Sequence, residues 1–431
     1  MTGSSAVQIA DSIEDAIRNG HLNGGDTLPP VRQAAKVLGV HHNTVASAYA
    51  RLRDAGLVQS SGRAGTWVND IELPYDALAK PMAEGVVDCA SGNVDVNFLP
   101  DPASAFKHLP YQPIGYEVGG IDPGFSVWLK ARLRRDGIPP DHLAVMSSSL
   151  DALERALRAH AHAGDTVLVE DPSWPPILAL VRALGLRIEP VAMTPDGIDL
   201  NSLEKRLKTA VAVIMTPRAH NPTGVDYTQE TLQGLRDLAQ HSPRTLFIFD
   251  DHWGALTGDP LPFAFQDVEH WLYIRSASKP LGPDFRLAVC AGSERIITRM
   301  ARAQILGPRW VSHIIQRAVH WLWSDDRHTP RLEAARAAYH LRRETLRDCL
   351  SDLKIKTWDG TGLHVWIHVP HEADTVQALA LSGWAVQPGH PFRLRSKPGI
   401  RVSIANISPI DAPRLARDIA TSIRPRSRLV T

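Results

Sequence analysis

A single lysine flanked by hydroxyl groups is the residue best suited to chemistry in this sequence. Lys279 lies in WLYIRSASKPLGPDFRLAVCA, residues 271–291, together with Ser276, Ser278 and Arg286. The apolar runs before and after it are typical of two strands joined by a loop. A lysine amine can form a Schiff base with an aldehyde cofactor, and hydroxyls beside a guanidinium can hold an attached phosphate. Taken alone, the stretch fits an ordinary surface lysine at least as well, so the interpretation depends on other parts of the chain.

A second stretch, VMSSSLDALERALRAHA at residues 145–161, places three serines before a helical pattern. Asp151 follows Ser148 by three residues, which is the spacing of a capping box at a helix start. Free amides and the positive dipole end of such a helix bind anions, so Ser148, Ser149 and the amide of Leu150 are candidates for a phosphate site. The same serines are also explained if they only cap the helix.

Three further residues follow apolar runs that are typical of strands. Trp174, in the proline-bounded turn of VEDPSWPPI, could stack on a planar ring or could be a core or interface aromatic. Asn221, in TPRAHNPTG, offers a hydrogen-bond donor. Asp250 ends the apolar run of TLFIFDDHWG, where a carboxylate is costly unless it meets a positive partner such as a pyridinium N–H.

The composition predicts a large globular protein. Of the 431 residues, 44% are hydrophobic and 22% are charged, which indicates two to three packed regions rather than disorder. Cys89, Cys290 and Cys349 form no CxxC pair, so neither a disulfide framework nor a zinc site is expected. With no signal-peptide pattern and no apolar run of membrane-spanning length, we expect a soluble cytoplasmic protein.

The first 68 residues have the pattern of three short helices and two strands. Isoleucines four residues apart predict a first helix from Ala6 to about Gly20, and two prolines and Gly39 bracket a second. A third helix, in HHNTVASAYARLRDAGL, would turn Val45, Tyr49 and Leu52 toward the core. Two helices joined by a glycine turn make a helix-turn-helix, and LVQSSGRAGTWV predicts a two-stranded wing. The net charge is only +1, yet residues 32–68 hold five basic side chains against one acidic.

Residues 6–68 resemble the winged helix-turn-helix domain of GntR-type bacterial regulators. The resemblance is carried by LPPVR, VHHNTVASAYARL, AGL and GRAGTWV. It implies phosphate contacts from Arg32, Arg51 and Arg63, and base contacts from His42, Asn43 and Thr44. His41 departs from the family, which usually has a serine or a similar helix cap there. The alternative is a winged helix used only for protein contacts.

The rest of the chain has the pattern of an α/β protein. Residues 69–86 lack periodicity and read as a short linker after the DNA-binding domain of residues 1–68. From Val87 to the end at residue 431, strand-like runs alternate with helical stretches, which predicts a mostly parallel sheet with its ligand at the carboxyl ends of the strands. Residues from about 326 to 431 predict a smaller α+β lobe.

The lysine, phosphate site, stacking ring, amide and strand-end carboxylate resemble, in this order, the fold type I aminotransferases that depend on pyridoxal 5'-phosphate (PLP). HNPTG, and SASK followed by Arg286, are the specific motifs. The resemblance implies a Schiff base on Lys279, a pairing of Asp250 with the pyridine nitrogen and a hydrogen bond from Asn221 to the ring oxygen. The other roles that it implies are ring stacking by Trp174, phosphate binding by Ser149, Leu150, Ser276, Ser278 and Arg286, a substrate-carboxylate grip by Arg401, and a reach to the neighbouring subunit's phosphate by Tyr116. His252 stands where the family commonly has a tyrosine that contacts the ring oxygen, which leaves catalytic competence open.

A GntR-like domain joined to an aminotransferase-like domain resembles MocR-type transcription regulators, and this resemblance runs along nearly the whole chain. Its closest stretches, which include DDHWGAL and WVSHIIQ, resemble MocR regulators tied to vitamin B6 salvage. It implies a homodimer that binds a DNA operator, with PLP or its adduct with an amino acid or amine as the effector. The alternatives are a working PLP-dependent aminotransferase with a regulatory DNA-binding domain, and a structural DNA-bending protein.

Overall fold

The computed structural model describes residues 1–18, 21–22, 24–54, 57–61, 65–68, 85–109, 113–257, 259–263 and 265–423. Near the N-terminus these form α1 (Ala6–Arg18), α2 (Val31–Leu38) and α3 (His42–Asp54), with β1 (Thr27–Leu28), β2 (Val58–Ser61) and β3 (Gly65–Val68). The strands form an antiparallel sheet in the order β1-β3-β2. The predicted helices and wing are confirmed, and β1 is an additional strand that the pattern does not indicate.

An apolar core of its own holds these N-terminal elements together. Val45, Tyr49 and Leu52 are buried on the inward face of α3, as predicted, and the Tyr49 hydroxyl donates to Pro29 O at 2.8 Å. Gly39 ends α2 with φ 65°, a left-handed conformation that glycine adopts without steric cost. Packing of this kind fixes α3, and therefore the residues on its outer face.

The larger part of the chain is built on an eight-stranded sheet with the order β5-β12-β11-β10-β9-β6-β7-β8. Its strands are β5 (Leu143–Met146), β6 (Thr166–Asp171), β7 (Arg187–Thr194), β8 (Gly197–Ile198), β9 (Ala210–Met215), β10 (Leu246–Asp250), β11 (Trp271–Ser276) and β12 (Ala288–Gly292). Neighbours β6, β9, β10 and β11 are parallel, whereas β12 runs antiparallel to β11 and to β5. The carboxyl ends of β5, β6, β9, β10 and β11 therefore lie at one edge of the sheet.

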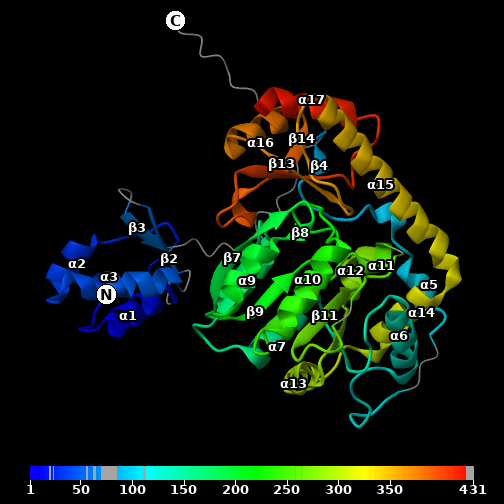
Figure 1. Ribbon diagram of the computed structural model, residues 1–431, viewed down its shortest axis with the longest axis horizontal. Helices are drawn as coiled ribbons and strands as arrows, with labels where there is room; N and C mark the ends of the chain where they lie inside the picture. Colours follow the sequence, from blue (N-terminus) through cyan, green and yellow to red (C-terminus); the bar gives the residue numbers. More distant parts are fainter. Residues whose placement is uncertain are drawn as a thin grey trace, which may run out of the picture. The chain divides into compact units, whose positions relative to one another are not determined.

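Helices surround this sheet and connect it to a smaller one. They are α5 (Pro102–Phe106), α6 (Pro123–Arg135), α7 (Ser149–His160), α8 (Pro175–Ala183), α9 (Leu200–Leu207), α10 (Gln229–Gln240), α11 (Gly254–Thr257), α12 (Ser278–Leu281), α13 (Glu294–Ile305), α14 (His313–Ser324), α15 (Thr329–Asp352), α16 (Glu372–Leu381) and α17 (Ala412–Ile423). Helices α7 and α9 pack on strands of the sheet, and the long helix α15 runs from the end of α14 to the smaller lobe (Figure 1). Every residue of β10, β11 and β12 is buried, as expected of strands covered on both faces.

The smaller lobe contains a four-stranded sheet in the order β13-β15-β14-β4. Its strands are β13 (His364–His368), β14 (Trp384–Pro388), β15 (Gly399–Ser403) and β4 (Val87–Cys89). Strand β4 pairs in parallel with β14, although almost 300 residues separate them along the chain. The loop that follows β4 is thereby brought to the smaller lobe, which the sequence pattern does not indicate.

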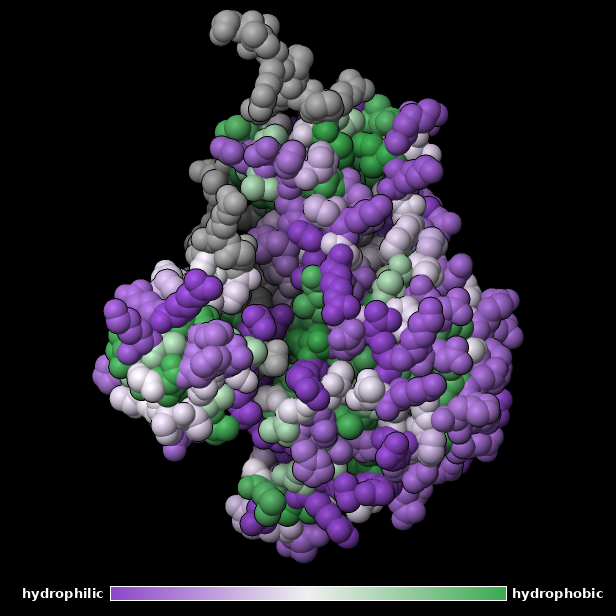
Figure 2. Space-filling view, turned by 60° about the vertical axis from the view of Figure 1, so that its left-hand side comes forward, coloured by the Kyte–Doolittle hydropathy of each residue, from purple (hydrophilic) through white to green (hydrophobic). Residues whose placement is uncertain are grey.

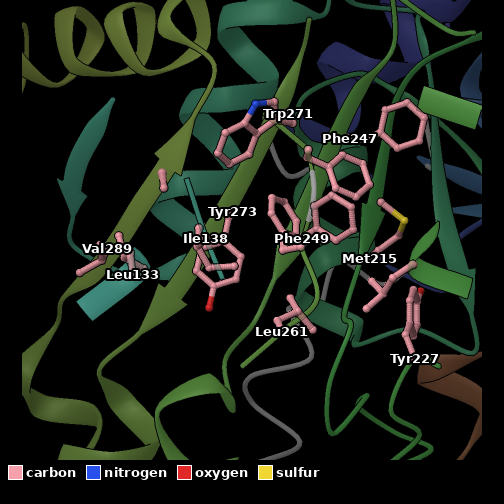
Figure 3. Close-up of a cluster of buried hydrophobic side chains, with 14 of the residues drawn as sticks. Leu133, Ile138, Met215, Tyr227, Phe247, Phe249, Leu261, Trp271, Tyr273 and Val289 are labelled. Carbon is pink, nitrogen blue, oxygen red and sulfur yellow. The ribbon is translucent and has the colours of Figure 1, made fainter. Parts of the chain in front are cut away.

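An aromatic cluster fills the core beneath the eight-stranded sheet (Figure 3). Phe247 and Phe249, from β10, pack beside Trp271 and Tyr273 of β11, and all four are buried. Fully burying an aromatic side chain contributes roughly 2–3 kcal/mol, so this cluster stabilises the pairing and position of β10 and β11.

Hydrophilic side chains cover most of the face shown in Figure 2, with apolar residues scattered among them. Within the described ranges, no helix is long and apolar enough to cross a bilayer.

Candidate functional site

Lys279 lies in α12, directly after the carboxyl end of β11. Its Nζ donates a hydrogen bond to Gly92 O at 2.9 Å, in the loop that follows β4. Burial, and then the charge of Arg401, lower the pKa of the Lys279 amine to about 8. A nucleophilic amine must be neutral, so this environment prepares Lys279 for attack on a carbonyl near neutral pH.

Asp250, at the carboxyl end of β10, is a buried carboxylate that pairs with no basic side chain among the described residues. Its Oδ1 has no hydrogen-bond partner among the described residues, and the Oγ of Ser149, which lies near it, has none either. Burial raises the pKa of Asp250 to about 7, opposed by the Ser149 hydroxyl and reinforced by the charges of Asp251 and Glu170. A positive or proton-donating group placed beside Oδ1 would stabilise the ionised form.

The next residue, Asp251, is fully compensated. Arg218 donates from Nε to Asp251 Oδ1 at 3.1 Å and pairs with Oδ2, which also accepts from the Tyr273 hydroxyl at 2.6 Å. Burial alone would raise the pKa of Asp251, but the charge and hydrogen bond of Arg218, with further help from Arg275 and Tyr273, hold it below its usual value. Within the described ranges, one of these two buried carboxylates is thus paired and the other is not.

The start of α7 presents amides and hydroxyls at the same edge of the sheet. The Ser148 hydroxyl accepts from Asp151 N at 3.1 Å, and Asp151 Oδ2 accepts from Ser147 N at 2.9 Å, so the predicted capping spacing forms a real cap. The amides of Ser149 and Leu150 lie in the first turn, where amides have no acceptor within the helix.

Ser276 and Ser278 lie at the junction of β11 and α12. The Ser276 hydroxyl contacts the Ser278 hydroxyl at 3.1 Å and accepts from Ser278 N at 3.1 Å. Arg286 is exposed, and the hydrogen bond of its side chain joins Nη1 to Pro283 O at 3.5 Å. Its backbone is left-handed, with φ 45° and ψ 55°, which is strained for a residue other than glycine. The structure therefore shows no contact between the Arg286 side chain and either serine.

Asn221 and Arg401 contact one another. Arg401 Nη1 donates to Asn221 Oδ1 at 3.2 Å, which leaves the amide nitrogen of Asn221 available as a donor. Arg401 is buried in β15, its Nη2 donates to Ala90 O, and its Nε has no described partner. Burial lowers the pKa of Arg401 to about 10, although Asp88 opposes this.

His252 and His364 lie near the lysine, and His220 lies near His252. Sequence reasoning selected only His252. Burial, with the charge of Lys279 next, lowers the pKa of His252 to about 3, so its imidazole is neutral at physiological pH. His220 Nδ1 lies 2.7 Å from Thr223 Oγ1, and its Nε2 lies 3.2 Å from Glu170 Oε2. His220 belongs to HNPTG, so the motif that identified Asn221 could have indicated it as well.

The third histidine, His364, begins β13 and is buried with its Nδ1 unpartnered among the described residues. Burial and the charges of Arg401 and Lys279 lower its pKa well below the usual value. Gly92 packs so close that a Cβ on it would lie 2.7 Å from His364 Cε1. Neither residue had a sequence signal, because a histidine at the start of an apolar strand and a loop glycine are both common.

Trp174 and Tyr116 are not joined to these residues by any described contact. Trp174 is half-buried between β6 and α8, just after the cis Asp171–Pro172 bond. Tyr116 is 78% exposed, and its ring contacts Arg309, whose guanidinium carbon lies 4.7 Å from the ring centroid. Their predicted roles in ring stacking and in the partner subunit's site stay predictions.

The outer face of α3 carries the residues predicted to touch DNA. Arg32, on α2, and His42, Asn43 and Arg51 are exposed, Thr44 is half-buried, and Arg63 lies outside the described residues. His41 replaces the usual cap effectively, because its Nδ1 accepts a hydrogen bond from Asn43 N at 3.3 Å.

The sequence matches two family models. Residues 135–419 match aminotransferase class I and II, and residues 5–68 match the bacterial regulatory proteins of the gntR family. The chain therefore belongs to the GntR-type regulators that carry a class I and II aminotransferase domain. The winged helix and the fold type I aminotransferase domain expected from the sequence are thus confirmed.

Individual relatives agree with this assignment. The chain is 36% identical to the vitamin B6 salvage pathway transcriptional repressor PtsJ of Salmonella typhimurium, over 97% of this chain and 98% of that protein. It is 24% identical to the HTH-type transcriptional regulator TauR of Rhodobacter capsulatus, over 98% and 97% of the two chains.

Solved structures share the fold. LysN, the alpha-aminoadipate aminotransferase of Thermus thermophilus, has a TM-score of 0.71 and 20% identity over 86% of this chain and 96% of its own. Kynurenine aminotransferase of Pyrococcus horikoshii has a TM-score of 0.70 and 20% identity over 81% and 96%.

Proposed function

We propose that this chain is a PLP-responsive transcription regulator that controls vitamin B6 salvage genes. The observation that supports it most is the buried Oδ1 of Asp250, which has no partner among the described residues and lies at the same sheet edge as the low-pKa amine of Lys279. PtsJ, a regulator of that pathway, matches nearly the whole chain. The protein would act in the cytoplasm as a homodimer on a double-stranded operator.

The residues present fit pyridoxal phosphate. Asp250 Oδ1 would accept from a protonated ring nitrogen, and the free amide nitrogen of Asn221 would donate to the ring oxygen. When bound, the cofactor supplies an aldehyde that condenses with the amine of Lys279. The phosphate would be held by Ser148, Ser149 and the Leu150 amide at the start of α7, and by Ser276, Ser278 and Arg286. Trp174 would stack on the ring, and Tyr116 would reach the partner's phosphate.

Reduction with borohydride tests the cofactor site. Protein incubated with pyridoxal phosphate, reduced and digested should carry the phosphopyridoxyl group on the peptide that contains Lys279. Lys279→Ala should lose that label, while slow labelling of exposed lysines such as Lys397 stays unchanged. Equal labelling of several lysines in the unmodified protein would contradict the assignment.

We infer that α3 reads the operator. Arg32, Arg51 and Arg63 would contact phosphates, and His42, Asn43 and Thr44 would contact bases in the major groove. Arg51→Gln should weaken binding to all sequences alike and reduce the salt slope by about one, whereas Asn43→Ala should relax discrimination between the operator and single-base variants. A uniform loss from both substitutions would contradict these roles.

A working aminotransferase is the second candidate, favoured by the unpartnered Nε of Arg401, which suits a substrate carboxylate. The neutral His252 argues against it, because the family commonly places a tyrosine hydroxyl there. Loaded protein mixed with amino and keto acids distinguishes the two. Turnover of about 1 per second or faster would favour the enzyme, and its absence would favour the regulator.

A further inference from the structure

A cavity of about 440 Å³ lies in the aminotransferase-like part of the chain, apart from the residues assigned to the cofactor. Its walls come from Trp253, from the segments 256–257 and 259–262, from one face of α15 and from the loop 360–362. Arg218, Asp226 and Tyr227, from beside the large sheet, complete the lining. None of Lys279, Asp250 or Arg401 lines it. Tyr227 and Leu261 both belong to the buried core cluster, and both are labelled in the lower part of Figure 3.

The cavity contains a buried guanidinium with no carboxylate partner. Arg343, on α15, is 1% exposed, and its Nη1 and Nη2 donate to the carbonyl oxygens of His364 and Trp358. Its Nε has no partner within the described part of the chain, and no carboxylate there lies within ion-pair distance. Burial, and then the charge of Arg347, lower its pKa to about 10. The charges of Asp226 and Glu344 oppose this lowering, although neither carboxylate forms an ion pair with the guanidinium. A buried charge without a directly paired carboxylate is costly, and an anion beside it would remove part of that cost.

The remaining surface of the cavity is suited to an apolar body. Trp253, Leu256, Leu261 and Tyr339 line it and are buried. Asp226 also lines the cavity, and its Oδ1 already accepts from Ala219 N at 2.6 Å and from the Thr361 hydroxyl at 2.8 Å. Asp259, which is exposed, is another acidic group in the lining. Exposed Arg336 and His340 add positive or proton-donating groups at the opening, where exposed Glu333 also lies.

We propose that this cavity binds a small carboxylate with an aromatic or aliphatic body, with the carboxylate at Arg343. A cavity of this size, mainly apolar with a few polar groups, has the anatomy of a small-molecule site.

Two contacts connect the cavity to the cofactor site. Arg218 lines the cavity and holds Asp251, the residue next to Asp250. Arg343 bonds the backbone oxygen of His364, whose imidazole responds to the charges of Lys279 and Arg401. A carboxylate in the cavity should therefore change the affinity for pyridoxal phosphate, and the cofactor should change the affinity for the carboxylate by the same factor. This coupling, unlike binding itself, rests on the proposed function.

Calorimetric titration of the full-length, cofactor-free protein tests the cavity with benzoate, phenylacetate and 3-phenylpropionate. The neutral benzamide, with the shape of benzoate, tests the need for charge. Ala337→Trp fills the cavity from an exposed position on α15, and Ala334→Trp, exposed on the same helix outside the cavity, is its matched control. Arg343→Gln removes the buried charge, and Arg401→Gln removes the other carboxylate-binding candidate.

At least one of the three acids should bind, at least tenfold more tightly than benzamide. Ala337→Trp and Arg343→Gln should each weaken that binding at least tenfold, while Ala334→Trp and Arg401→Gln leave it within twofold. If Arg343→Gln does not fold, the effect of Ala337→Trp on acid binding still tests the proposal. Failure of all three acids to bind at millimolar concentration, binding of benzamide as tight as that of the acids, or indifference to Ala337→Trp would overturn the proposal.

Pyridoxal phosphate titrations with and without the bound acid then test the coupling. A shift of threefold or more in cofactor affinity supports it. If the affinity for pyridoxal phosphate is the same with and without the acid, only the coupling is refuted. If pyridoxal phosphate binds in neither condition, the proposed function is refuted, and the proposal for the cavity is unaffected.

Discussion

Asp250 and Asp251 are neighbours in sequence with opposite electrostatic environments. Asp251 is held by Arg218 and Tyr273, whereas Asp250 Oδ1 has no hydrogen-bond partner in the described part of the chain. A charge left without compensation costs stability in the free protein, and such a cost is retained where a ligand removes it. The contrast is therefore the strongest residue-scale evidence for a positively charged ligand group at Asp250.

Asp250→Asn should stabilise the cofactor-free protein at neutral pH. The pKa of Asp250 is raised from 3.8 to about 7, so between these values the folded state keeps a proton that the unfolded state has lost. The free energy of unfolding therefore falls as the pH rises from about 4 to 7, by roughly 4 kcal/mol at about 1.4 kcal/mol per pKa unit. Asp250→Asn has no carboxyl group to titrate at this position, so its free energy of unfolding should not fall for this reason. Urea unfolding of both proteins at pH 4 and pH 8 measures the difference.

Asp251→Asn is the matched control for that experiment. It leaves Arg218 without its buried partner and should destabilise the protein by about 3–5 kcal/mol at neutral pH. If the stability of Asp250→Asn and of the unmodified protein depended on pH in the same way, the pKa of Asp250 would not be raised in the folded protein.

Arg286→Gly should separate stability from cofactor affinity. The left-handed backbone at Arg286 costs about 1–2 kcal/mol relative to an allowed conformation, and glycine removes that strain while adding chain entropy to the unfolded state. The free energy of unfolding of the cofactor-free protein should stay the same or rise slightly, while the affinity for pyridoxal phosphate falls at least tenfold. A variant that loses stability but keeps full affinity would show that Arg286 is structural.

Residue types and motifs led to Lys279, Asp250 and Asn221 as candidates, because each has a distinctive neighbourhood in sequence. Their roles toward a cofactor stay predictions. The contact of Lys279 with Gly92 and the closeness of His364 could not be predicted, since they depend on the parallel pairing of β4 with β14 across the chain. Residues whose role comes from tertiary position alone leave no local signal.

At the scale of elements, the start of α3 is held by an unusual cap. His41 Nδ1 accepts from Asn43 N, although an imidazole is not among the preferred capping side chains. His41→Ala should destabilise the N-terminal helices by about 1 kcal/mol, and His41→Ser should restore or exceed the original stability. Urea unfolding of the winged helix, followed by the signal of Trp67 in β3, measures this. His42→Ala, an exposed neighbour, is the control, and equal effects at both positions would contradict the cap.

The periodicity of apolar residues predicted most helices and strands, but it did not predict which strands pair. Alternation of apolar runs and helical stretches predicted a largely parallel sheet, and β6, β9, β10 and β11 are parallel. The two-residue β1 was missed because it is too short for a pattern, and its pairing with β3 depends on the turn before α2. Such elements are set by neighbours in space.

At the scale of the whole molecule, the proposal requires that cofactor and DNA binding influence each other. A ligand can shift an equilibrium only by its difference in affinity between two states, and coupling free energies are typically about 1–3 kcal/mol. A cofactor-dependent change in operator affinity of about 5- to 150-fold would therefore be ordinary.

The most direct measurement is the affinity of the purified protein for the DNA upstream of its own and neighbouring genes, at fixed salt, with and without pyridoxal phosphate. The same titration with Lys279→Ala is the control. We predict that the cofactor changes affinity or footprint at least fivefold in the unmodified protein, and that the change disappears in Lys279→Ala. Equal binding in both states of the unmodified protein, or a change that persists without Lys279, would contradict the view that this site senses the cofactor.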